Sequence, residues 1–73
     1  MSLGVSEMFG KLIKEKRLAA GLTQQQLGEM LGYTGRSAMN IVQGWEYDKR
    51  PVPLEKLRAL AKALNIPLES LIP

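Results

Sequence analysis

The sequence predicts a compact all-α fold of five helices, and three observations support this fold class. Apolar residues recur every three or four positions along most of the 73 residues, which is the period of an amphipathic helix. Glycines, prolines and cap-forming Ser and Thr residues divide the chain into five short segments. The chain has no Cys and no His, so a single apolar core must stabilise the domain without a disulfide or a zinc ion, and 45% of the residues are hydrophobic.

The first helix is expected to begin after Ser6, which is a good N-cap, and to end before Gly21, where a left-handed residue is typical. Its apolar residues at helical spacing are Phe9, Leu12, Ile13 and Ala20. Residues 1–5 are expected to be a disordered N-terminus or a cloning remnant, and residues 6–73 a single domain.

The second helix is predicted from a capping box. Thr23 is the expected N-cap, and Gln26, three residues later, completes the box. Gly32 is expected to end this helix after about two turns. The apolar side of the helix consists of Leu27, Met30 and Leu31.

A turn over residues 33–36, with the sequence YTGR, is expected to separate the second helix from the third. Ser37 is then the expected N-cap of the third helix. Ala38, Val42 and Trp45 follow at positions i, i+4 and i+7, so they share one face. The outer side of this helix is polar and uncharged.

Pro51 and Pro53 are expected to end the third helix, because proline lacks the backbone N–H, and Pro53 suits the first position of a fourth helix. Asn65 is the expected stop of the fourth helix, and Pro67 begins a last short helical turn. The expected buried stripe of the fourth helix is Leu54, Leu57, Ala61 and Leu64. The last turn contains Leu68, Leu71 and Ile72.

Composition argues against several classes of function. Without His or Cys the chain lacks the usual general base, the usual nucleophile and most transition-metal ligands, so we expect no enzyme, no metal and no cofactor. The N-terminus has no signal segment, and no apolar run approaches the roughly 18 residues of a membrane span, so we expect a cytoplasmic protein. The net charge of +3 and the pI of about 9.5 are compatible with polyanion binding, but they could equally serve solubility.

The second and third predicted helices are the most informative stretch, because two short helices joined by a brief turn can cross steeply and present the second to the DNA major groove. The motifs are LTQ at the start of helix 2, WE at the end of helix 3, KR before helix 4, and the run LEKLRALAKALNIPLESL. With these motifs the chain, from Phe9 to Ile72, resembles the phage repressor and Cro-type helix-turn-helix family of regulators (xenobiotic response element-type). The resemblance implies a five-helix, lambda-repressor-like DNA-binding domain whose helix-turn-helix is formed by helices 2 and 3.

The chain departs from this family in one place. Between Gly32 and Trp45 lie twelve residues, whereas the family has about eight, an excess of roughly one helical turn. We place the excess in a lengthened turn over residues 33–36, which leaves Ser37 at the family's N-cap position. The alternative is a third helix that begins at Thr34, and in that case Arg36 would enter the groove instead of flanking it.

The resemblance implies that the third helix reads bases, and the family's base-reading positions fall on Ala38, Met39, Asn40 and Gly44. Asn40 has the strongest hydrogen-bonding capacity, since an amide can pair with both N6 and N7 of adenine. Ala38 and Met39 could contact a thymine methyl group, and Gly44 could allow the close approach of a backbone. The expected base contacts, with neighbouring candidates included, are Arg36, Ser37, Met39, Asn40, Gln43 and Gly44. The simpler interpretation is a helix face of solvated polar residues.

Phosphate contacts supply most of the affinity for DNA, and the family makes them at the start of helix 2 and in the loop before helix 4. The expected phosphate contacts are Thr23, Gln24, Tyr47, Lys49 and Arg50. For Lys49 and Arg50 the alternative is an ordinary solvated loop, and the adjacent Asp48 weakens their positive field. The lysines interpreted as solvated surface residues are Lys11, Lys14, Lys56 and Lys62.

Structural roles are assigned to Arg17, Val42, Trp45 and Glu46. Trp45 should be a core residue, since a buried aromatic side chain contributes much to so small a domain. The family often pairs a glutamate at the position of Glu46 with an arginine at the position of Arg17. We therefore expect a partly buried ion pair that ties the first helix to the end of the third.

The expected function is that of a sequence-specific regulator of transcription, a repressor, that binds double-stranded DNA. It would occupy a palindromic operator as a homodimer whose recognition helices are about 34 Å apart. The expected dimer contacts are Leu68, Leu71 and Ile72, and packing within the monomer is the alternative. The protein would be prokaryotic or from a phage, and nucleoid-associated when bound. A second hypothesis is a protein-interaction module of the same fold, an antitoxin or a bridging coactivator, with little direct DNA binding.

Overall fold

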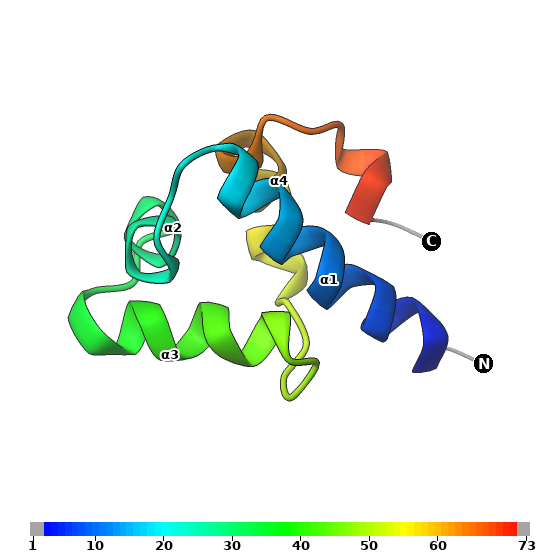
Figure 1. The fold of residues 1–73 in the computed structure, drawn as a ribbon, viewed down its shortest axis with the longest axis horizontal. Coiled ribbons are helices and arrows are strands. Elements are labelled where there is room, and N and C mark those ends of the chain that lie inside the picture. The colour runs from blue at the N-terminus through cyan, green and yellow to red at the C-terminus, as the bar shows by residue number, and fades with distance from the viewer. Residues whose placement is uncertain (1–2, 72–73) are drawn as a thin grey trace.

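The computed structural model describes residues 3–71, which form four α-helices and one 3-10 turn (Figure 1). The elements are α1 (Leu3–Ala19), α2 (Gln24–Met30), α3 (Gly35–Glu46), α4 (Leu54–Leu64) and the 3-10 turn η1 (Leu68–Leu71). The all-α class is confirmed, but within the described residues the expected fifth helix is only this four-residue turn, whose type is 3-10 and not α.

The helices surround one apolar core. In Figure 1, α3 lies along one side of the molecule, α2 lies over its N-terminal half, and α1 runs diagonally between them and the α4–η1 end. The buried core residues are Ile13, Leu27, Leu31, Val42, Trp45, Leu60, Ala61, Leu64 and Leu71. Every element contributes at least one of them, so the position of α3 is determined by contacts with the rest of the domain.

The predicted caps of the second and fourth helices are present. The Oγ1 of Thr23 accepts the backbone N–H of Gln26 at 3.0 Å, and the Oε1 of Gln26 accepts the N–H of Thr23 at 2.8 Å. Gly21 has a φ of 74°, as expected for the residue that ends α1. Asn65 ends α4 with a φ of 58°, a left-handed conformation that asparagine tolerates.

Helix α1 begins at Leu3 and not after a cap at Ser6, so residues 3–5 are the first helical turn instead of a disordered end. Helical backbone hydrogen bonding therefore continues through Ser6, which is an N-cap only when the residues before it are not helical. The part of the prediction that concerns residues 1 and 2 lies outside the described residues.

The third helix follows the alternative in which the helix begins at Thr34. Thr34 is the N-cap of α3, in an extended conformation, and its carbonyl accepts the N–H of Ala38 at 3.1 Å. Gly35, with a φ of 56°, allows the sharp entry into the helix. The expected turn over residues 33–36 with an N-cap at Ser37 was therefore wrong, and the excess residues form an added first turn of α3.

Several predicted core positions are corrected. Leu54 is 85% exposed, because α4 starts there and Pro53 is its N-cap rather than its first residue, while Leu60 is fully buried. Met30 is 56% exposed at the end of α2, and Ala20 lies beyond the end of α1 and is exposed.

The C-terminal segment packs differently from the dimer surface expected of it. Leu71 is 1% exposed and belongs to the core of the monomer, so it is not available for a contact with a second copy. Leu68 packs half-buried against the same core. Ile72 lies outside the described residues.

Candidate nucleic-acid interface

The crossing of α2 over α3 depends on two small residues. A methyl group placed on Gly28 of α2 would lie 2.5 Å from the backbone oxygen of Ala38 and 2.7 Å from its Cβ, so only glycine allows this approach. Ala38 is fully buried at the crossing. Ala38 is therefore a packing residue, and the expectation that it contacts a thymine methyl group was wrong.

The outer face of α3 carries a polar stripe that we call the reading stripe: Arg36, Asn40, Gln43 and Tyr47. These residues are spaced at i, i+4, i+7 and i+11, so they lie on one side of the helix, and all four are exposed. Ser37 is also exposed beside the stripe, whereas Met39 is half-buried. The added first turn of α3 places Arg36 on the stripe itself instead of on a flanking turn.

The loop after α3 folds back onto the helix. The backbone N–H groups of Lys49 and Arg50 donate to the carbonyl of Gly44 at 2.8 and 3.3 Å. Asp48 makes this reversal in a left-handed conformation with a φ of 59°. The loop thereby brings two cations to the C-terminal end of the reading stripe.

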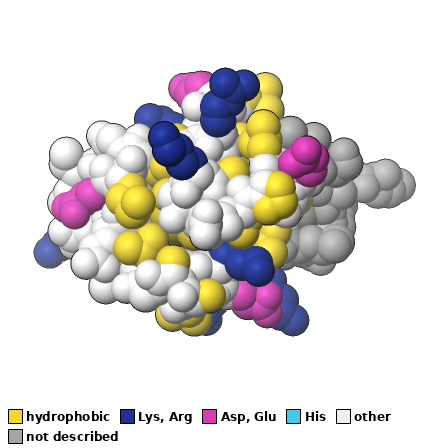
Figure 2. Space-filling model, turned by 90° about the horizontal axis from the view of Figure 1, so that it is seen from above, with side chains coloured by type: hydrophobic (Ala, Val, Ile, Leu, Met, Phe, Trp, Pro, Cys, Tyr) yellow, Lys and Arg dark blue, Asp and Glu magenta, His cyan; other side chains and the backbone are white. Residues whose placement is uncertain are grey.

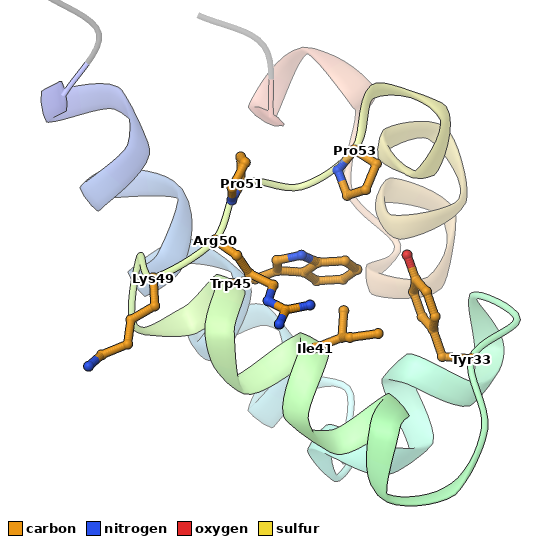
Figure 3. Close-up of a pocket in the computed structure, with 7 residues that line it drawn as sticks. All are labelled: Tyr33, Ile41, Trp45, Lys49, Arg50, Pro51 and Pro53. Carbon is orange, nitrogen blue, oxygen red and sulfur yellow. The ribbon is translucent and has the colours of Figure 1, made fainter.

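Gly44 lies beneath the side chain of Arg50. A methyl group on Gly44 would lie 2.8 Å from Cγ of Arg50 and 3.0 Å from its Cδ and Nε. The expectation that Gly44 contacts a base is therefore corrected, because its exposed side is covered by the aliphatic part of an arginine. Figure 3 shows that the Arg50 side chain runs along α3 toward Ile41, while Lys49 points away from the domain.

Two surface hollows meet at Arg50. One, of about 430 Å³, is lined by Asn40, Gln43, Gly44, Tyr47, Lys49 and Arg50. The other, of about 480 Å³, is lined by Tyr33, Ile41, Trp45, Lys49, Arg50, Pro51 and Pro53 (Figure 3). Lys49 and Arg50 both line the two hollows, so these loop residues lie between the reading stripe and the apolar flank of α3.

A buried polar network connects α1 to the C-terminal end of α3. The Nε of Arg17 donates to Oε2 of Glu46 at 2.6 Å, and its Nη2 donates to Oε1 at 3.3 Å. The Nη1 of Arg17 donates to the carbonyl of Leu22 at 2.8 Å. The expected ion pair is thus present, and it is buried, with side-chain exposures of 9% and 1%. It joins α1 to the last residue of α3.

The start of α2 is tied into the same network. The Nε2 of Gln24 donates to Oε1 of Glu46 at 3.1 Å, so the Gln24 side chain, an expected phosphate contact, is engaged within the protein. Thr23 is exposed, and its hydroxyl oxygen accepts the N–H of Gln26. That hydroxyl keeps a hydrogen to donate to a phosphate oxygen. Thr23 is therefore the better phosphate candidate at this end.

Two contacts were missed by the sequence reasoning. The Nζ of Lys56, interpreted as a solvated side chain, donates to the carbonyl of Leu31 at 2.8 Å and lies 4.9 Å from the ring centre of Tyr33. The Tyr33 ring in turn packs edge-on against Trp45, with ring centres 6.1 Å apart. No local pattern signals a contact between residues 25 positions apart. For Gly28, a glycine inside a helix was a signal of close packing.

The face seen in Figure 2, which looks down on the molecule from the side away from α3, has no uniform charge. Lys and Arg side chains alternate there with Asp and Glu and with hydrophobic side chains. Among residues 3–71, no helix is long and apolar enough to cross a bilayer. The same residues contain no group of three His, Cys, Asp or Glu side chains placed to hold a metal ion.

Comparisons with known proteins agree with this geometry. A family model described as helix-turn-helix matches residues 13–71, which include α2, α3 and the loop that follows them. Neither the curated proteins nor the solved structures gave a match. Since the matched region covers most of the chain, the protein belongs to the helix-turn-helix family, of the Cro type.

Proposed function

We propose that this protein is a sequence-specific regulator of transcription that binds double-stranded DNA with α3 in the major groove. The observation that carries the proposal is the reading stripe, in which a guanidinium and two amides lie exposed on the side of α3 that faces away from the core. Guanidinium groups recognise guanine and amides recognise adenine in the major groove. The proposal assigns the protein no catalytic role.

The order of residues along the stripe supports a division of labour. Arg36 lies in the first turn of α3, and recognition helices contact base edges mainly with their N-terminal residues. Asn40 lies one turn further along, and Gln43 follows. A half-site that contains a guanine and an adenine at neighbouring positions would match these side chains.

Phosphate contacts are proposed on both sides of the stripe. Thr23, at the start of α2, would donate its hydroxyl on one side, and Lys49 with Arg50 would contact the backbone at the other end, where Tyr47 adds a second hydroxyl. Each of these four residues is exposed. Contacts to the DNA backbone position the protein, and contacts to base edges select the sequence. The proposed arrangement supplies both kinds of contact.

We further propose repression by occupation of a palindromic operator by two copies of the chain. Helix-turn-helix proteins bind half-sites about one DNA turn apart, and the pair of half-sites mirrors the two-fold symmetry of the dimer. A single domain with a net charge of +3 supplies few phosphate contacts, so two copies are needed for strong binding at physiological salt.

Selection of bound duplexes from a random pool, followed by titration of the best duplex, tests the proposal. Asn40→Ala is expected to weaken binding to the selected duplex about tenfold and to leave binding to an unrelated duplex nearly unchanged. Lys62→Ala, which removes an exposed cation in the last turn of α4, is the control and should affect both duplexes little.

One outcome of the titration would overturn the proposal. Binding to duplex DNA that is undetectable even at low salt would exclude a DNA-binding role, because electrostatic affinity is strongest there. That result would favour the second hypothesis, a protein-interaction module of the same fold.

A further inference from the structure

We propose that Gly44 is a positioning residue for the DNA interface. Because it has no side chain, it leaves a space on α3, which we call the seat, in which the Arg50 side chain lies beside the reading stripe. This inference rests on the proposed function, since it gives that interface a fixed cation. Gly44 itself would touch no DNA. It would act through the side chain that lies across it.

The side chain of Arg50 lies over Gly44, in space that the side chain of any other residue at position 44 would need. Three consecutive side-chain atoms of Arg50, Cγ, Cδ and Nε, lie 2.8 to 3.0 Å from the point that a Cβ at position 44 would occupy. The backbone of the loop is joined to the same glycine, whose carbonyl accepts the N–H groups of Lys49 and Arg50. Both the main chain and the side chain of Arg50 are therefore positioned by contacts with the same residue of α3.

The seat determines the direction of the guanidinium. Arg50 extends along α3 toward Ile41, whereas its neighbour Lys49 extends away from the domain (Figure 3). Arg50 lines both the hollow with Asn40 and Gln43 and the hollow with Tyr33 and Ile41, as Lys49 also does, but only Arg50 runs along the helix. A phosphodiester group at the edge of the major groove would meet this side chain already in place. An arginine held in this way loses less side-chain entropy on binding than a free lysine.

Glycine at position 44 lowers the stability of the helix, and the proposed role of the seat gives a reason for its presence there. A glycine in the interior of a helix is less favourable than alanine, and position 44 is two residues from the end of α3. Gly10 and Gly28 are different, because an added methyl group at either would meet backbone oxygens. At Gly44 the three nearest atoms all belong to the exposed side chain of Arg50, which can be displaced without moving the backbone. Packing of the fold therefore does not require glycine here.

The test is a double-mutant cycle on the selected duplex. Gly44→Ala should leave the melting temperature unchanged or raise it by a few degrees, yet weaken DNA binding about tenfold. Arg50→Ala should weaken binding by a similar factor and reduce the slope of log affinity against log salt by about one. The double variant should bind no more weakly than Arg50→Ala alone, because the glycine matters only through the arginine.

Two results would overturn the inference while the proposed function stands. The first is a Gly44→Ala protein that binds the duplex as tightly as the unaltered protein. The second is a double variant in which the two single losses multiply. In both cases Asn40→Ala would still lose sequence-specific binding. Lys62→Ala, with one cation fewer and no place at the interface, controls for net charge. If the unaltered protein binds no duplex at low salt, the proposed function fails and the inference falls with it.

Discussion

Three side-chain hydrogen bonds from two other helices converge on Glu46. Its carboxylate accepts hydrogen bonds from Arg17 in α1 and from Gln24 in α2, and the residue itself ends α3. Removing one partner of a buried ion pair leaves the other charge uncompensated in a poorly solvated site. The positions of α1 and α2 relative to the end of α3 therefore depend on this one carboxylate.

Glu46→Gln is expected to lower the free energy of unfolding by about 3 kcal/mol, because the amide keeps the shape of the side chain but leaves the Arg17 guanidinium unpaired. Urea titration followed by circular dichroism measures the change. Glu29→Gln is the matched control: Glu29 is exposed and accepts a hydrogen bond from Gln25 on its own helix, so its loss should cost about 0.5 kcal/mol or less. Equal midpoints for the two variants would contradict the assigned role of Glu46.

Residue by residue, the sequence was informative where a signal is local or belongs to the family pattern. The capping box at Thr23 needs only two residues three positions apart, and the Arg17–Glu46 pair followed from the resemblance. The positions of Lys56 and Arg50 could not be predicted, because their partners, Leu31 and Gly44, lie on other elements. Gln24 shows the same limit, since its engagement with Glu46 depends on how α2 meets the end of α3.

At the scale of elements, the angle between α2 and α3 depends on the contact between Gly28 and Ala38. Because a methyl group on Gly28 would lie 2.5 Å from a backbone oxygen, the helices must separate to accept it. Gly28→Ala is therefore expected to destabilise the domain by about 1 to 3 kcal/mol despite the better helix propensity of alanine. Thermal unfolding measures this change.

The matched comparison for Gly28→Ala is Gly44→Ala, the same substitution on the other helix of the motif. The nearest atoms to a methyl group at position 44 belong to the exposed Arg50 side chain and not to the backbone. Gly28→Ala should therefore lower the melting temperature, whereas Gly44→Ala should raise it or leave it unchanged. Ala38→Gly should not rescue Gly28→Ala, because the backbone oxygen of residue 38 remains in place. A Gly28→Ala protein as stable as the unaltered one would show that the crossing is not limited by this contact.

The start of α3 illustrates why element boundaries resist prediction. Thr34 and Ser37 are both good N-caps, and Gly35 is a residue typical of turns, so local preference does not decide between them. In the structure Ala38 is buried against Gly28 and its N–H is bonded to Thr34, which extends the helix backward by one turn. A tertiary contact thus places Arg36 on the reading stripe, as the alternative interpretation required.

On the scale of the whole molecule, the dimensions fit the spacing expected of paired half-sites. The domain measures 34 × 23 × 22 Å, and α3 runs roughly along the longest axis (Figure 1). Two copies whose recognition helices are about 34 Å apart, one turn of DNA, could therefore lie side by side on one face of a duplex. Leu71 is in the core of the monomer, so this leucine does not supply the contact between copies that was expected of it.

This arrangement predicts that binding depends on the phase of the two half-sites. About 5 base pairs inserted between them rotate one half-site by half a turn of the duplex, so two copies that touch on one face are carried to opposite faces. We expect the insertion to weaken the binding of the second copy about tenfold, because the contact between copies no longer contributes to it. Fluorescence anisotropy titration of duplexes with and without the insertion measures the change, and a duplex with one half-site gives the reference affinity. If both duplexes bind two copies with that reference affinity, the chain acts as independent monomers, and occupation of a palindromic operator by a dimer is wrong even though α3 reads each half-site.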